Sequence, residues 1–217
     1  MPAAPAFPAE PGRDCPLCPR LAAFRMAARA REPGWFNAPV PTFGDPAARL
    51  LIVGLAPGMK GANRTGRPFT GDYAGDLLYA TLISRGFARG RYAADPGDGL
   101  SLVDAAITNA VRCVPPENKP TPAEARTCRD FLTATIEGMA RLEAIVALGR
   151  IAHDNVVSAL GARRAAMPFG HGAEHAAGRL TLYDSYHCSR YNTNTGVLTP
   201  AMFEAVFDRV AARLGHG

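Results

Sequence analysis

Four apolar runs alternate with longer segments of mixed polarity along the chain. The first of them is a continuous apolar run, which is typical of a strand covered on both faces. The runs occupy residues 49–54, 104–109, 143–149 and 179–187. The segments between and around them predict helices over 17–31, 74–85, 151–160 and 200–214. Alternating strands and helices predict a three-layer α/β/α domain with a four-stranded parallel central sheet.

One further helix has a clear start signal. Thr121 is placed as an N-cap, Pro122 stands at the first helical position, and Glu124 completes a capping box. The first residues, MPAAPAFPAEPGRD, are rich in proline and alanine and lack the apolar core of a signal peptide. We therefore predict a disordered tail over 1–14 and a single domain over 15–217.

Composition narrows the class of protein. A hydrophobic content of 47% in 217 residues suits one well-packed domain, and no apolar run reaches the roughly 18 residues of a membrane helix. The net charge of +5 suits a polyanionic partner such as nucleic acid. We expect a cytoplasmic monomer that binds no membrane.

Three unusual loops follow predicted strands, after Gly54, Thr108 and Tyr186. In parallel sheets ligands bind at the carboxyl ends of the strands, so these loops are expected to converge on one site. The first loop is rich in glycine, which lets the backbone approach a flat or phosphorylated ligand closely.

Four of the five cysteines form two pairs along the sequence, and the fifth stands alone. Cys15 and Cys18 form a C-x-x-C pair, Cys113 and Cys128 form a wide pair, and Cys188 stands alone. Four thiolates in this arrangement can bind zinc or a [4Fe–4S] cluster. Zinc ribbons usually have two tight knuckles, and the wide second pair departs from that pattern.

Three segments together resemble the iron–sulfur branch of the uracil-DNA glycosylases: GLAPGMKGANRTGRPFTGD, ITNAVRCVPPENKPTP and SYHCSRYNTNTGVLTP. Leu55, at a position where a sister family carries an acidic residue, indicates family 5, also called type B. The resemblance covers about residues 15–214. It implies a [4Fe–4S] cluster held by Cys15, Cys18, Cys113 and Cys128.

The resemblance also implies roles for individual residues. His187 would stabilise the departing base, Asn109 would read its edge, and Phe69 would stack on its face. Asp72 would orient the attacking water, although it could merely cap the following helix, and Asp76 is a rival. The remaining expected contacts are with the base (Gly54, Leu55, Ala56, Gly58, Asn192) and with DNA phosphates (Arg64, Arg67, Ser189, Arg190).

The implied activity is hydrolysis of uracil, and by resemblance also hypoxanthine, from double-stranded DNA. Two alternatives are a nucleotide hydrolase that uses the glycine loop and a non-catalytic iron–sulfur or zinc DNA-binding protein. The first lacks the G-K-[ST] of a P-loop. Cys188 replaces the proline usual in the family, and we interpret it as a neutral variant. His171 and His175 have metal-ligand spacing, but adjacent glycines favour a surface loop.

Overall fold

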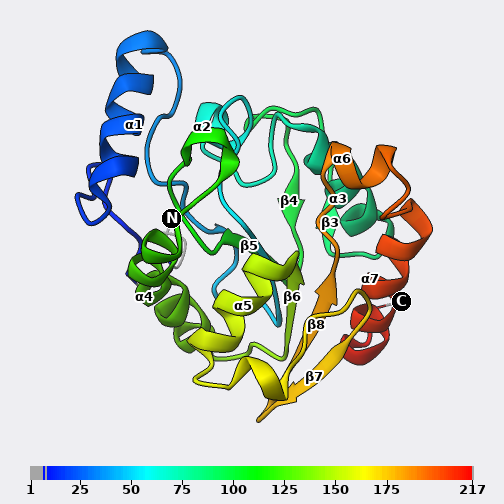
Figure 1. Ribbon diagram of the computed structural model, residues 1–217. Coiled ribbons are helices and arrows are strands. Elements are labelled where there is room, and N and C mark those ends of the chain that lie inside the picture. The colour runs from blue at the N-terminus through cyan, green and yellow to red at the C-terminus, as the bar shows by residue number, and fades with distance from the viewer. Residues whose placement is uncertain (1–6, 8, 217) are drawn as a thin grey trace.

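The computed structural model describes residue 7 and residues 9–216. A six-stranded sheet in the order β1-β5-β2-β6-β8-β7 forms the centre, and β3 and β4 form a separate small ribbon (Figure 1). The strands of the large sheet are β1 (Phe43–Gly44), β2 (Leu50–Gly54), β5 (Ala105–Asn109), β6 (Ala144–Leu148), β7 (Glu174–Ala177) and β8 (Leu180–Ser185). Those of the ribbon are β3 (Ala88–Arg89) and β4 (Ser101–Leu102).

Helices connect and cover these strands. The long ones are α1 (Pro19–Arg31), α3 (Tyr73–Ser84), α4 (Pro122–Gly138), α5 (Arg150–Ala159) and α7 (Pro200–Leu214). The short ones are α2 (Ala62–Thr65), α6 (Arg190–Asn194) and the 3₁₀ turns η1 (Pro116–Asn118) and η2 (Arg164–Ala166). The capping box at the start of α4 is confirmed, because Thr121 accepts from the Glu124 amide and Glu124 accepts from the Thr121 amide.

Side chains alternate along the central strands and form two cores. On one face, residues such as Ile52 and Ile107 pack against α3 and α7. On the other face, residues such as Val53 and Ala106 pack against α4 and α5. This confirms the predicted three-layer α/β/α class, and it explains why most residues of the central strands are apolar.

The sheet is larger than the predicted one. The four strands β5, β2, β6 and β8 are parallel, as predicted. Two short strands, β1 and β7, extend the sheet on its two edges in antiparallel orientation. The predicted count of four strands is therefore wrong, because both edge strands lie in segments whose sequence is typical of loops. His175 lies on β7 and not in a surface loop.

The first residues contact the domain where they are described. Phe7 packs against the core between the sheet and α4–α5. The Glu10 carboxylate accepts hydrogen bonds from Nη1 of Arg112, whose side chain is 1% exposed. The rest of the predicted tail, residues 1–6 and 8, lies outside the described residues. Within those that are described, no helix has the length and hydrophobicity to cross a membrane.

Candidate active site

A pocket of about 590 Å³ lies at the carboxyl ends of the central strands. It is formed by the glycine-rich loop after β2, the end of β5, and the loop that joins β8 to α6. The predicted residues that line it are Leu55, Ala56, Gly58, Phe69, Asp72, Asn109, His187, Ser189 and Arg190. The three loops thus meet at one site, where ligands of parallel sheets bind.

The glycine-rich loop is held from behind by a buried arginine. Both Nη atoms of Arg67 donate to the Asp98 carboxylate at 2.8 Å, and its Nε donates to Thr70 at 2.7 Å. The guanidinium also lies over the ring of Tyr79, 5.4 Å from its centroid. Since the Arg67 side chain is only 5% exposed, the predicted phosphate contact is wrong. Arg67 instead supports the segment that carries Phe69 and Asp72.

Phe69 and Asn109 form the floor of the pocket around Gly54. Phe69 has a left-handed backbone (φ 52°), which is unusual for a bulky residue and is often found at functional sites. Asn109 ends β5, lies opposite Gly54 in the strand register, and is 3% exposed. Within the described residues its side chain makes no hydrogen bond, so its amide is available to a ligand in the pocket.

Gly54 is closely packed against both floor residues. A Cβ at this position would lie 2.5 Å from Asn109 Oδ1 and 2.6 Å from Phe69 Cζ. Gly54→Ala is therefore expected to displace both side chains and to lower the single-turnover rate on a base-modified duplex by about 10²-fold. Gly34→Ala, where a Cβ meets nothing within 4 Å, is the matched control. Equal rates for the two variants would show that Gly54 does not position the floor.

His187 forms part of the pocket wall. Its ring is stacked near that of Phe69, with centroids 5.9 Å apart. Burial lowers the pKa of His187 to about 4, so its imidazole is neutral at physiological pH. Asn192 lies outside the main pocket and donates from Nδ2 to the His187 carbonyl at 2.8 Å. It contacts the same histidine that the sequence analysis placed beside the substrate.

Asp72 is the carboxylate of the pocket. It precedes α3, yet its side chain accepts no capping hydrogen bond. Within the described residues, its buried Oδ1 has no hydrogen-bond partner. Burial raises the pKa of Asp72, against a smaller lowering by the nearby amides of Gly75 and Ala74. Asp76, the alternative candidate, is exposed and does not line the pocket.

The structure adds residues that the sequence analysis did not assign. Tyr73 lines the pocket with its side chain partly exposed, and the Arg190 guanidinium lies 5.1 Å from its ring centroid. Lys60 and Asn118 also line the pocket. Arg64 is exposed but does not reach the pocket lining. The sequence signal for Tyr73 was its place directly after Asp72, at the start of a helix.

The four paired cysteines lie around a second, small cavity. Cys15, Cys18, Cys113 and Cys128 all line it, together with Leu21 of α1 and Phe131 of α4. The backbone amide of Arg112 donates to Cys128 Sγ at 3.3 Å. Cys188 is fully buried elsewhere, with its thiol against the Ala74 carbonyl at 3.5 Å, and burial raises its pKa. A buried thiol held in its uncharged form is a poor nucleophile.

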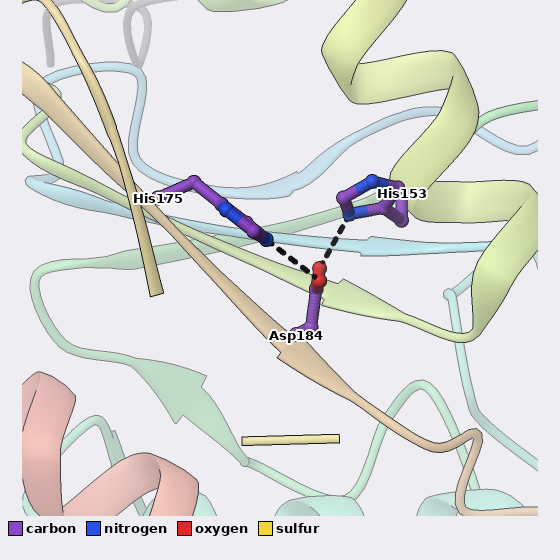
Figure 2. A group of neighbouring side chains, drawn as sticks. All are labelled: His153, His175 and Asp184. Carbon is purple, nitrogen blue, oxygen red and sulfur yellow. Dashed lines mark hydrogen bonds and ion pairs between the residues drawn. The ribbon is translucent and has the colours of Figure 1, made fainter. Parts of the chain in front are cut away.

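A third polar group lies at the β7 edge of the sheet. Figure 2 shows His153 of α5 and His175 of β7 both directed at the carboxylate of Asp184 on β8. These side chains could offer three metal ligands. However, His153 Nδ1 is 2.6 Å from Asp184 Oδ1 and its Nε2 is 2.8 Å from the Met167 carbonyl. Both neighbours are acceptors, so both ring nitrogens carry a proton and the pair is an imidazolium–carboxylate ion pair.

This ion pair predicts a pH-dependent stability. Burial by itself lowers the pKa of His153, but the hydrogen bond to Asp184 and its negative charge raise it above 6.5 overall. The stabilisation is therefore complete below the unfolded-state pKa and is lost as the pH rises through the folded-state pKa. We expect the free energy of unfolding of wild type to fall as the pH rises above about 6.5. The corresponding decrease for His153→Gln should be smaller.

Urea denaturation at several pH values measures this effect. Parallel curves for wild type and His153→Gln would contradict the ion pair. A rise in melting temperature with Zn²⁺ that His153→Gln abolishes would indicate a metal in place of the proton.

The fold and the pocket define the class of protein, and the comparisons with known proteins agree. Residues 41–211 match the family model described as the uracil DNA glycosylase superfamily, and the chain belongs to this superfamily.

Relatives narrow the assignment to one branch. The Type-5 uracil-DNA glycosylase of Thermus thermophilus is 48% identical over 87% of this chain and 89% of its own. That of Pyrobaculum aerophilum is 40% identical over 93% of this chain and 90% of its own. A Type-4 uracil-DNA glycosylase of Archaeoglobus fulgidus is 39% identical, but over only 52% of this chain. The resemblance to the type-5 branch is confirmed.

Proposed function

We propose that this chain is a monofunctional DNA glycosylase that hydrolyses the N-glycosidic bond of uracil in double-stranded DNA and leaves an abasic site. The observation that carries the proposal is the single pocket in which Phe69, Asn109, His187 and Asp72 meet. An enzyme that acts on a base must take it out of the stack and hold it in such a pocket.

The pocket floor and wall would recognise the base and its leaving charge. The Phe69 ring offers a stacking surface, and the free amide of Asn109 offers one donor and one acceptor to the pyrimidine edge. As the glycosidic bond breaks, negative charge develops on uracil. A neutral imidazole at His187 donates a hydrogen bond to that anion, where the charge appears.

Asp72 would act on the sugar side. Breaking the bond leaves positive charge on the sugar, and its carboxylate can both stabilise that charge and orient the attacking water. Its unpartnered Oδ1 has hydrogen-bonding capacity left for that water. A Cβ at Gly61 would collide with this carboxylate, so glycine there keeps Asp72 in place.

Exposed basic side chains around the pocket would contact the DNA backbone. Lys60 and Arg190 line the pocket mouth, and Arg64 is exposed nearby on α2. Phosphate contacts of this kind position a duplex without reading its sequence. Ser189 is the N-cap of α6, and its Oγ accepts a hydrogen bond from the backbone amide of Asn192. Its side chain also lines the pocket.

A [4Fe–4S] cluster bound by Cys15, Cys18, Cys113 and Cys128 fits the residues present. All four line one cavity, and the donors that face Cys113 and Cys128 are suited to thiolate ligands. When bound, the cluster would supply a structural link between α1 and the loop after β5, without turnover. We also propose that the protein acts as a monomer in the cytoplasm.

Cys113→Ser is expected to remove most of the protein's iron, its brown colour and its absorbance near 400 nm, and to lower its melting temperature. The reason is that loss of one of four ligands opens the centre, and metal binding is part of the folding free energy. Cys188→Ser is the matched control, because Cys188 lies outside the cysteine cavity. A stable and colourless Cys113→Ser protein with wild-type activity would contradict the cluster.

The direct test is alkaline cleavage of a labelled duplex that contains one uracil. Incubation with the protein is expected to produce strand breaks at the uracil only after alkali treatment, and none in a matched duplex with thymine. Breaks without alkali would show lyase chemistry, for which Lys60 at the pocket is the available amine.

Intact strands after alkali, from folded protein, would overturn the proposal for uracil. The same duplex with hypoxanthine in place of uracil then tests the wider substrate range that the resemblance implies.

A further inference from the structure

Arg25 of α1 is buried beside the cysteine cavity. It is 2% exposed and lines the cavity together with all four ligand candidates. Its Nη1 donates to Cys113 Sγ at 3.1 Å, and its Nη2 donates to the Cys15 carbonyl at 3.0 Å. Its guanidinium therefore contacts one member of each cysteine pair.

Arg25 has no direct carboxylate partner among the described residues, and its charge is only the weakest of the arginine charges that lower the pKa of Asp14. Among the residues that the structure describes, no carboxylate lies within ion-pair distance of Arg25, and its buried Nε has no hydrogen-bond partner. The other arginines of α1 differ in this respect. Arg20 pairs with Glu124, Arg29 pairs with Asp14, and Arg31 is exposed.

A buried and unpaired guanidinium is strongly unfavourable in a folded protein, so the site requires an anion. The two groups that accept hydrogen bonds from Arg25 are Cys113 Sγ and the Cys15 carbonyl, and neither is charged unless Cys113 is a thiolate. Four thiolates around an iron–sulfur cluster carry net negative charge, and they would supply the missing counter-charge at the place where the guanidinium lies.

We propose that Arg25 is the buried counter-ion of the metal centre, and that it tunes the centre through its charge and its hydrogen bond to Cys113. This inference rests on the proposed cluster. Reduction adds an electron to a centre that is already anionic, and a fixed cation stabilises the reduced form more than the oxidised one. Arg25 therefore raises the reduction potential and slows loss of the cluster.

The experiment compares intact, cluster-loaded wild type with Arg25→Gln, Arg25→Lys and Arg31→Gln. Arg31→Gln is the matched control, since it removes one exposed charge from the same helix. Two quantities are measured: the midpoint potential in a dithionite titration with mediators, and the rate at which absorbance near 400 nm disappears in the presence of an iron chelator.

Arg25→Gln is expected to shift the midpoint potential to a more negative value and to lose its cluster several-fold faster than wild type. Arg25→Lys keeps the charge without the forked geometry, so both of its values are expected between those of wild type and Arg25→Gln. Arg31→Gln is expected to match wild type.

An Arg25→Gln protein with the potential and the chelation rate of Arg31→Gln would overturn the inference while leaving the cluster in place. If Arg25→Gln does not fold, Arg25→Lys provides the test. A midpoint potential and a chelation rate equal to those of wild type would then show that the hydrogen-bond geometry of Arg25 has no role, contrary to the proposal. A wild-type protein without iron would overturn the proposed cluster itself.

Discussion

Replacing His187 by alanine is expected to lower the single-turnover rate of uracil excision by about 10²–10³-fold, because the variant loses the proposed donor to the departing base. Binding of the uracil duplex should change little, since the phosphate contacts remain. Rapid quenching of a labelled duplex under enzyme excess measures the rate, and fluorescence anisotropy measures the affinity.

His187→Gln provides the control for this prediction. Its amide can donate a hydrogen bond from a similar region of the pocket wall, so it should retain part of the activity that alanine loses. Burial of His187 also predicts that the pH profile of the excision rate has no inflection from this residue near pH 6.5, because its pKa is about 4. A wild-type rate in His187→Ala would remove this residue from the leaving-group site.

Asp72→Asn is expected to lower the same rate by about 10²–10⁴-fold, the range that is typical of a positioned acid or base. The neutral amide cannot stabilise the sugar cation or accept a proton from water. Asp76→Asn is the matched control, because Asp76 lies near Asp72 in the chain but is exposed and outside the pocket lining. A large loss in Asp76→Asn with none in Asp72→Asn would reverse the assignment.

The raised pKa of Asp72 gives this prediction a pH dependence. The proposed role requires the ionised carboxylate, so the excision rate should fall as the pH drops through a value above the ordinary 3.8, and Asp72→Asn should lack that decrease. The same burial destabilises the ionised form of the folded protein at neutral pH. Asp72→Asn is therefore expected to melt at a higher temperature than wild type.

The central fold could be predicted because its physical signals are local. Strands β2 and β6 are buried at every residue, which leaves continuous apolar runs in the sequence. The Thr121 capping box is equally local, because its two partners are three residues apart. Strands β1 and β7 were missed since they contain only two and four residues, and their pairing depends on strands elsewhere in the chain.

The site was predictable to a similar extent. Position at the carboxyl end of a strand brought Phe69, Asn109, Asp72 and His187 to one pocket, as expected from the parallel sheet. Arg67 was misplaced because its partner, Asp98, comes 31 residues later, and burial of an arginine depends on such a partner.

The two short edge strands also bear on how the molecule behaves at high concentration. A long parallel sheet with open sides would offer unpaired amide and carbonyl groups to a neighbouring chain, and so promote aggregation. Here one side ends in the two residues of β1, and the other in β7, whose Glu174 pairs with Arg209 on α7. Such borders give the sheet edge of a second copy little backbone to pair with.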